Sequence, residues 1–199
     1  SRGCTVLLDT FLLPSRHELP RPEGARLEWD GGMYQLGAAD NRAYAREFVA
    51  PLLRHVVVER ALRAVRLFNP VNEPMAYGVY QMPEGGPDTH VHYVEMYREM
   101  REALDAAGLP RERVGLVGCD ANEPEGFPVL EMAARGVDID PFVDAYSIHY
   151  YRLSFDYLTG DPRNREVATT IRDAVDKHTA KIARYCRARG KPLLAPEIG

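Results

Sequence analysis

The chain has 199 residues, of which 45% are hydrophobic and 27% are charged, and its formal net charge is −4 at pH 7. This composition is typical of one globular domain with a sizeable apolar core, and it excludes an extended disordered chain. Charges of both signs are interspersed, so the sequence offers neither a basic stripe for nucleic acid nor a polybasic patch for a membrane surface. We therefore expect neither as a partner.

Cysteine usage points to the same class of protein. Cys4, Cys119 and Cys186 are isolated and odd in number, which indicates neither a disulfide framework nor a metal-binding knuckle. We expect them to fill the core, and we expect no cofactor and no bound metal. The sequence shows no run of about eighteen apolar residues and no signal-peptide pattern at its start, and it leaves the compartment and the oligomeric state open.

Short apolar runs rich in β-branched residues alternate with longer stretches of helical period along the chain. This alternation predicts βα units on a parallel sheet, and hence an α/β fold. The predicted strands span residues 5–13, 64–71, 114–119, 143–151 and 191–197. We treat residues 1–199 as a single domain, since no internal repeat or linker interrupts this order.

Four helices are predicted between these strands. The first has Asp40 as its N-cap and a kink at Pro51. Its apolar stripe at helical spacing consists of Phe48, Val49, Leu52, Leu53 and Val56. The second runs from Thr89 to Gly108, and its apolar face consists of Tyr93, Tyr97, Met100 and Leu104. The third spans 128–136. The last runs from Val167 to Gly190, with His178 in its apolar stripe.

Two glutamates close predicted strands. The stretch "LFNPVNEP" runs into Glu73 without an intervening turn, and "PLLAPEIG" places Glu197 at the end of the last strand. A second Asn-Glu-Pro puts Glu123 beyond Asp120 and Ala121, which we assign to a loop. A rigid strand end holds a catalytic carboxylate better than a loop does. We therefore predict the pair Glu73 and Glu197, although a solvated loop acid is the commoner role of a single glutamate.

Such a pair suits one reaction in particular. Hydrolysis of a glycoside with retention needs two carboxyl groups about 5–5.5 Å apart, one to protonate the leaving oxygen and one to attack the anomeric carbon. Strand ends that face the mouth of a βα barrel can supply this separation, and loops after the strands build the active site of such barrels. The Gly- and Pro-rich stretches 14–40 and 122–128 both follow predicted strands.

The motifs "NEP", "SIHYY" and "PEIG", in this order, resemble the signatures of the clan A glycoside hydrolases, and in particular the cellulase and mannanase-like family 5. The resemblance implies a TIM barrel, present here as an incomplete barrel of about five βα units that correspond to strands three to seven. It also implies a retaining enzyme for a β-linked glycan or glycoside. In it, Asn72 would bind the sugar 2-hydroxyl, Glu73 would be the general acid and base, Glu197 the nucleophile, and His149 and Tyr151 would lie beside that nucleophile.

Other side chains have open roles. Trp29, the only tryptophan, lies in the loop after the first strand, where it would stack on a sugar face or anchor the loop. Asp120 is either a binding acid at the same mouth or a turn cap. The pair His90 and His92 could ligate a metal only on an extended backbone, whereas their segment opens a helix, so we expect them near the acceptor side of the sugar site.

Two alternative functions remain open. One is a catalytically inactive carbohydrate-binding relative, and the other is a metal-dependent barrel hydrolase that uses His90, His92, His149 and Asp120. A closed barrel needs eight strands, whereas only five are recognisable here. We therefore expect a piece of a longer protein that is not competent alone, because its outer strands would be unpaired edges. The sugar, the linkage and the choice between endo and exo cleavage are not predicted.

Overall fold

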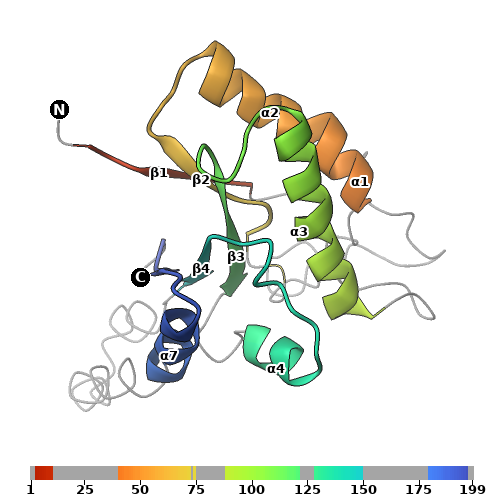
Figure 1. Ribbon diagram of the computed structural model, residues 1–199, viewed down its shortest axis with the longest axis vertical. Helices are drawn as coiled ribbons and strands as arrows, with labels where there is room; N and C mark the ends of the chain where they lie inside the picture. Colours follow the sequence, from red (N-terminus) through yellow and green to blue (C-terminus); the bar gives the residue numbers. More distant parts are fainter. Residues whose placement is uncertain are drawn as a thin grey trace, which may run out of the picture.

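The computed structural model describes residues 3–10, 40–72, 74, 88–121, 128–149 and 179–196. Its centre is a sheet of five strands in the order β1-β2-β3-β4-β5, and each pair of neighbours is parallel (Figure 1). The strands are β1 (Val6–Asp9), β2 (Val65–Asn69), β3 (Gly115–Ala121), β4 (Ala145–Ile148) and β5 (Leu193–Leu194). All five predicted strands are thus present.

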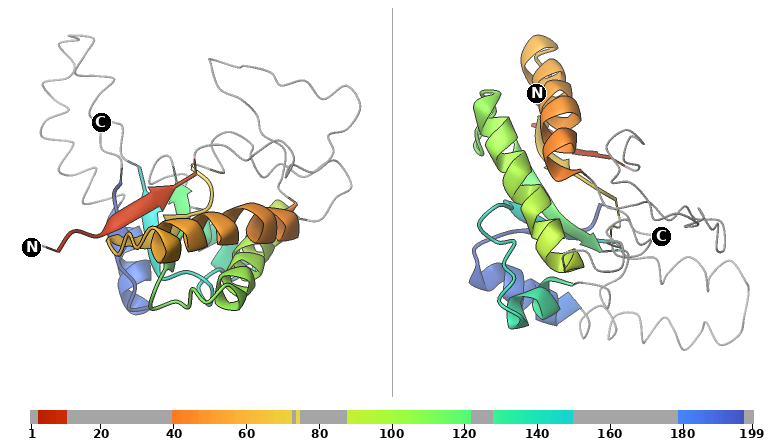
Figure 2. Two further views of the ribbon diagram at one scale, coloured as in Figure 1. Left: turned by 90° about the horizontal axis from the view of Figure 1, so that it is seen from above. Right: turned by 90° about the vertical axis from the view of Figure 1, so that its right-hand side faces the viewer.

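The strand order identifies the type of α/β fold. Crossovers between parallel neighbours are right-handed, so strands that follow one another in sequence place all their helices on one face of the sheet. A doubly wound sheet would instead need a reversal of the order. The described helices flank the outer side of the curled sheet (Figures 1 and 2). The fold is therefore a half-barrel, an incomplete TIM barrel, as the sequence predicts.

The first helical segment runs from α1 (Asn41–Ala43) through π-helical η2 (Tyr44–Val49) and α2 (Ala50–Arg54) to π-helical η3 (His55–Glu59). Asp40 caps it as predicted, since its Oδ1 accepts from the backbone N–H of Ala43 at 3.1 Å. Proline lacks an N–H and crowds the carbonyl four residues earlier. The wider π-helical turns on both sides of α2 allow the segment to continue through Pro51.

The buried face of this segment differs in part from the prediction. Phe48, Leu52 and Val56 are only partly buried, whereas Val49 and Leu53 are fully buried as expected. The most deeply buried apolar side chains of the segment, each at most 1% exposed, are Tyr44, Ala45, Val49, Leu53 and Val57. The reason is the π-type hydrogen bonding, which adds a residue to a turn and so moves the buried positions away from the regular helical period.

The other helices begin and end largely where the sequence predicts. In α3 (Thr89–Ala106), the predicted apolar face of four side chains is fully buried, and Gly108 follows the helix in the left-handed conformation, at φ 74°, that glycine adopts without strain. The third and last helices are α4 (Val129–Ala134) and α7 (Ala180–Ala188). The predicted start of the last helix near Val167, and His178, lie outside the described residues.

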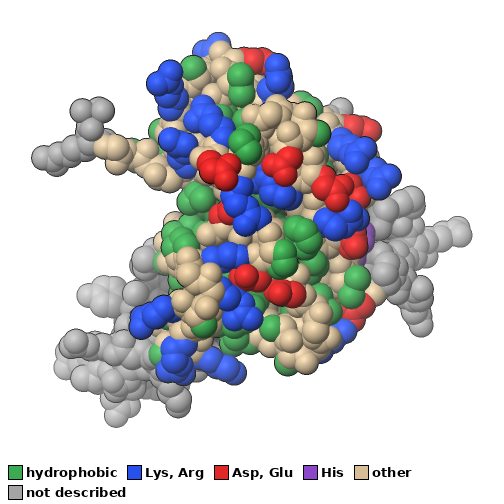
Figure 3. Space-filling model, viewed as in Figure 1, with side chains coloured by type: hydrophobic (Ala, Val, Ile, Leu, Met, Phe, Trp, Pro, Cys, Tyr) green, Lys and Arg blue, Asp and Glu red, His purple; other side chains and the backbone are tan. Residues whose placement is uncertain are grey.

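The core fills the space between the sheet and these helices. Its largest members are aromatic, with Tyr44, Tyr93, Tyr97, Tyr146 and Phe68 all fully buried. Cys119 and Cys186 are buried as expected, whereas the prediction for Cys4 is wrong, because it precedes edge strand β1 and is exposed. Basic and acidic side chains are interspersed on the outer face (Figure 3). None of the described helices is long and apolar enough to cross a membrane.

Candidate functional site

Polar side chains gather at the carboxyl ends of the first four strands. Parallel strands bring these ends to one edge, which is where TIM-barrel enzymes hold their active sites. The group, which we name the strand-end cluster, consists of Asp9, Asn69, Asn72, Asp120, Ser147 and His149. All of them except Asp9 are buried, and Asn69, Asp120, Ser147 and His149 have no exposed surface. Buried polar groups at this density need a full set of partners.

The carboxylate of Asp120 lies at the centre of the cluster. Asn69 donates its Nδ2 to Oδ2 at 2.7 Å, and Ser147 donates its hydroxyl to Oδ1 at 2.7 Å. His149 places Nε2 at 3.1 Å from Oδ1, within ion-pair distance. Side chains from β2 and β4 thus converge on one acid of β3.

The two asparagines connect Asp120 to β1. Asn69 donates to Oδ1 of Asp9 at 2.9 Å and to the carbonyl of Val71 at 3.2 Å. Asn72 is 3% exposed, and the surrounding acceptors favour the orientation in which its amide nitrogen lies 3.0 Å from Oδ2 of Asp9 and 3.3 Å from Oδ2 of Asp120. Both amides therefore bridge the carboxylates of the first and third strands.

A buried phenol fixes the turn between these asparagines. Tyr44 donates to the carbonyl of Pro70 at 2.7 Å, and its hydroxyl lies 2.9 Å from that of Thr10. The backbone N–H of Asn72 donates to the carbonyl of Thr10 at 3.0 Å. Burial raises the pKa of Tyr44 well above its usual value, so the phenol keeps its proton. The first helix thus helps to place Asn72.

Strand β3 reaches the cluster through a β-bulge. Gly118 pairs with Tyr146 and Ala121 with Ile148, so β3 uses one residue more than β4 over the same length. Within the bulge, Cys119 and Asp120 have φ values of 75° and 34°, which are uncommon for residues other than glycine. Bulges redirect side chains and are frequent beside functional sites. Here the bulge directs the Asp120 carboxylate at Asn69 and Ser147.

The structure brings together two of the predicted site residues. Asn72 and His149 both contact Asp120, although they come from different motifs. Glu73, Glu197, Tyr151 and Trp29 lie outside the described residues.

The bounds of two strands correct the sequence interpretation. Strand β2 ends at Asn69, so the prediction that it runs into Glu73 without a turn is wrong; Pro70 has no N–H with which to continue the ladder. Strand β3 includes Asp120 and Ala121, so their assignment to a loop is also wrong, because the bulge extends the strand. Position relative to a strand end therefore does not by itself favour Glu73 over Glu123.

The two histidines of the "THVH" motif open α3, as predicted. Nδ1 of His90 lies 2.8 Å from the guanidinium of Arg135, and Nδ1 of His92 lies 3.4 Å from Nδ2 of Asn41. Among the residues that the structure describes, no group of three or more His, Cys, Asp or Glu side chains is arranged to hold a metal ion.

Sequence reasoning missed three members of the cluster, namely Asp9, Asn69 and Ser147. Asp9 and Asn69 each end an apolar run, in "LLDT" and "LFNP", and a polar residue at that position is the signal that could have found them. Ser147 gives no such signal, because a serine within a buried strand is common in cores. Its role is visible only from the hydrogen bond to Asp120.

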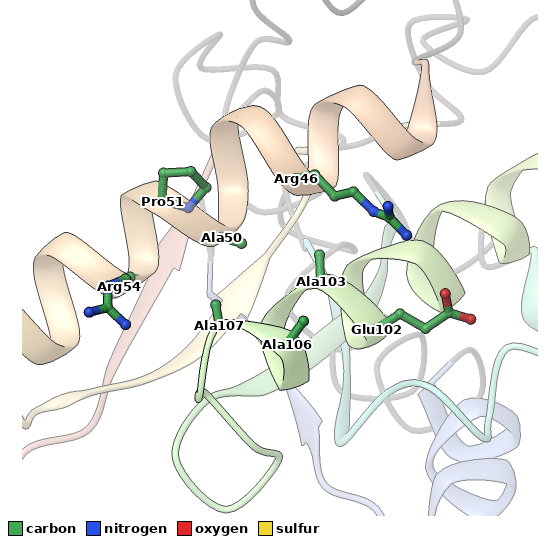
Figure 4. Close-up of a pocket in the computed structure, with 8 residues that line it drawn as sticks. All are labelled: Arg46, Ala50, Pro51, Arg54, Glu102, Ala103, Ala106 and Ala107. Carbon is green, nitrogen blue, oxygen red and sulfur yellow. The ribbon is translucent and has the colours of Figure 1, made fainter.

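A separate pocket of about 480 Å³ lies on the outer side of the half-barrel, between α2 and α3 (Figure 4). Alanines such as Ala50 and Ala103 line it, with Arg46, Arg54 and Glu102 around them. Its lining contains no residue of the strand-end cluster. We therefore place the candidate site at the strand ends and not in this pocket.

Comparisons with known proteins give a structural likeness but no sequence-level match. No protein-family model matches the chain, and no curated protein matches it. Among solved structures, a GH39 beta-xylosidase from Caulobacter crescentus is similar, with 17% sequence identity and a TM-score of 0.46. The match covers 77% of this chain and 29% of that one, so this chain spans less than a third of that protein. The fold assignment therefore rests on the strand order, and any function is a proposal.

Proposed function

We propose that the chain is the catalytic part of a retaining glycoside hydrolase that acts on a β-linked glycan or glycoside. The observation that supports this best is the meeting of Asn72 and His149 at one buried carboxylate. Each belongs to a motif of the clan A glycoside hydrolases, and they lie at the barrel edge where such enzymes bind substrate. The sequence order of the motifs adds to this support, with Asn-Glu-Pro before His-x-Tyr and a last glutamate after both.

In the proposed reaction, the two glutamates exchange roles between two steps. Glu197 attacks the anomeric carbon while Glu73 protonates the leaving oxygen, which forms a glycosyl ester on Glu197 and releases the aglycone. A neighbouring ionised Glu197 favours the protonated form of Glu73 in the first step. The ester then removes that charge, so Glu73 gives up a proton and activates the water that hydrolyses the ester.

The remaining predicted residues bind the sugar or hold the nucleophile. Because the carboxylates of Asp9 and Asp120 take up the amide nitrogen of Asn72, a sugar 2-hydroxyl would donate to its amide oxygen. Tyr151 and His149 are proposed to hold Glu197 in its charged form. Trp29 is proposed to stack on a sugar ring, whose apolar face suits an indole.

The decisive test is covalent trapping. The full natural chain would be incubated with a panel of activated 2-deoxy-2-fluoro glycosides, digested, and searched by mass spectrometry for the trapped sugar. A label on Glu197 is expected, and it would identify the nucleophile and the sugar class together. Turnover with inversion at the anomeric carbon, or a label on another residue, would contradict the mechanism. Binding of mannan, glucan or xylan with no turnover would instead identify a catalytically inactive carbohydrate-binding relative.

The two Asn-Glu-Pro motifs provide a matched pair for the acid. Glu73→Gln should lower kcat by about 10²- to 10⁴-fold on glycosides with poor leaving groups, since these need general acid catalysis. On 2,4-dinitrophenyl glycosides, whose leaving group needs no proton, Glu73→Gln should change the rate of the first step little. Glu123→Gln has the same sequence context and should behave as the wild-type protein. The opposite result would assign the acid to Glu123.

A further inference from the structure

Asp120 combines two features that are unfavourable for folding. Its carboxylate is fully buried, and among the described residues no Lys or Arg lies within ion-pair distance of it. Its backbone also has a positive φ within the bulge of β3. An apolar residue in a regular strand would avoid the desolvation of a charge and the backbone strain. Strain of this kind is concentrated at functional sites.

We propose that Asp120 is a positioning residue of the strand-end cluster: together with Asp9 it fixes the amide orientation of Asn72, and it keeps a proton on Nε2 of His149. Its effect on catalysis rests on the proposed function, whereas its effect on the two side chains does not. Asp120 is not itself assigned a contact with substrate.

The action on Asn72 follows from hydrogen-bond chemistry. An ionised carboxylate only accepts, so the amides of Asn69 and Asn72 must both present their nitrogens to Oδ2 of Asp120. An asparagine at position 120 would present an NH₂ group on one side. If that group faced the amides, only the carboxylate of Asp9 would still hold the nitrogen of Asn72 inward, so the preference for this amide orientation would weaken.

The action on His149 follows from charge. Oδ1 of Asp120 lies 3.1 Å from Nε2, and a carboxylate at this distance favours a hydrogen on that nitrogen. The backbone N–H of His149 donates to the carbonyl of Ala121 at 2.6 Å, which places the ring beside the bulge. Replacing the carboxylate partner of a metal-bound histidine typically changes activity by about 10- to 100-fold, and we expect the same range for the partner of His149.

The test compares Asp120→Asn with Asp144→Asn in the full natural chain. Asp144 is the control, because it is a partly buried acid that also bonds β3, with Oδ2 accepting from Leu116 N at 2.8 Å and Oδ1 lying 3.2 Å from Nε of Arg111. It precedes β4 at the opposite end of the sheet. Asp120→Asn should lower kcat on a dinitrophenyl glycoside by about 10- to 100-fold. Asp144→Asn should lower the melting temperature and leave kcat within about twofold of wild type.

A second measurement does not depend on turnover. Nitrogen-15 NMR of the His149 ring should show a proton on Nε2 in the wild-type and Asp144→Asn proteins and a changed ring spectrum in Asp120→Asn. If no glycoside is hydrolysed, the proposed function fails while this measurement still tests Asp120. An unprotonated Nε2 in the wild-type protein would overturn the proposal, even where Asp120→Asn does not fold. A kcat and His149 ring shifts equal to those of wild type in Asp120→Asn would also overturn the proposal.

Discussion

The close approach of Gly118 to Val143 allows a quantitative test of the packing beneath the bulge. A Cβ at position 118 would lie 2.7 Å from Cγ1 of Val143 and 3.3 Å from its Cβ. Carbon atoms in contact are normally about 3.5–4.0 Å apart. Val143 is fully buried and Gly118 has no positive φ, so Gly118→Ala introduces a steric clash without backbone strain.

The size of the effect follows from two opposing contributions. Overpacking of a core lowers the free energy of unfolding by about 1–3 kcal/mol. Replacing glycine also restricts the unfolded chain, which offsets about 0.4–1 kcal/mol. The net loss should be about 1–2 kcal/mol. For a chain of this length, each kcal/mol lowers the melting temperature by about 2–4 °C, which gives a decrease of about 2–8 °C.

A double-mutant cycle, measured by urea denaturation, tests the cause. Val143→Ala removes the methyl groups that clash, so the double variant Gly118→Ala with Val143→Ala should be more stable than the sum of the single changes by about 1–2 kcal/mol. Gly108→Ala is the control, since it has nothing within 4 Å but a φ of 74°, and its effect should be independent of Val143. Additivity of Gly118→Ala and Val143→Ala within about 0.5 kcal/mol would refute the reasoning.

Three further predictions concern other buried groups. Glu99 is 5% exposed, and its hydrogen bond to the Arg42 guanidinium lowers its pKa. Glu99→Gln should therefore lower the free energy of unfolding by about 1–2 kcal/mol at pH 7. In denaturation titrations, this difference from wild type should be lost as the pH falls below about 4, where the glutamate is protonated. Tyr44→Phe should cost about 1 kcal/mol in the same assay, because it removes a buried hydrogen bond to the carbonyl of Pro70, which still accepts from the Thr10 hydroxyl. Burial raises the pKa of the Cys186 thiol to about 11, and Cys119 is buried as well. A thiol reagent should therefore modify only the exposed Cys4 rapidly in the native chain, and all three cysteines after denaturation.

The sequence alone predicts most of the fold. Apolar spacing reports which side chains are buried, so it located five strands and the face of α3 correctly. Caps and turns with a local cause were also predictable, as at Asp40 and Gly108. The stripe of the first helical segment was only partly correct, because a change from α to π hydrogen bonding leaves no mark in the apolar pattern.

The candidate site was less predictable, because its geometry depends on contacts between distant segments. Asp120 follows a cysteine and precedes an alanine, which gives no local signal for a bulge. Its partners Asn69 and Ser147 come from the strands on either side, and only the pairing of β3 with both brings them to its carboxylate. By contrast, the end of β2 at Asn69 has a local cause in Pro70, which is visible in the sequence.

The position of the bulge also separates the stability of the sheet from the geometry of the site. Below it, Val117 pairs with Ala145 and Gly118 with Tyr146, and these pairs hold β3 to β4 without Asp120. Above it, the strand-end cluster is held by side chains that bond to one carboxylate. Gly118→Ala should therefore lower stability with little change at His149, whereas Asp120→Asn should change the His149 ring with a smaller effect on pairing. If Gly118→Ala and Asp120→Asn altered the free energy of unfolding and the His149 ring spectrum to the same extent, the bulge would not separate the sheet from the site.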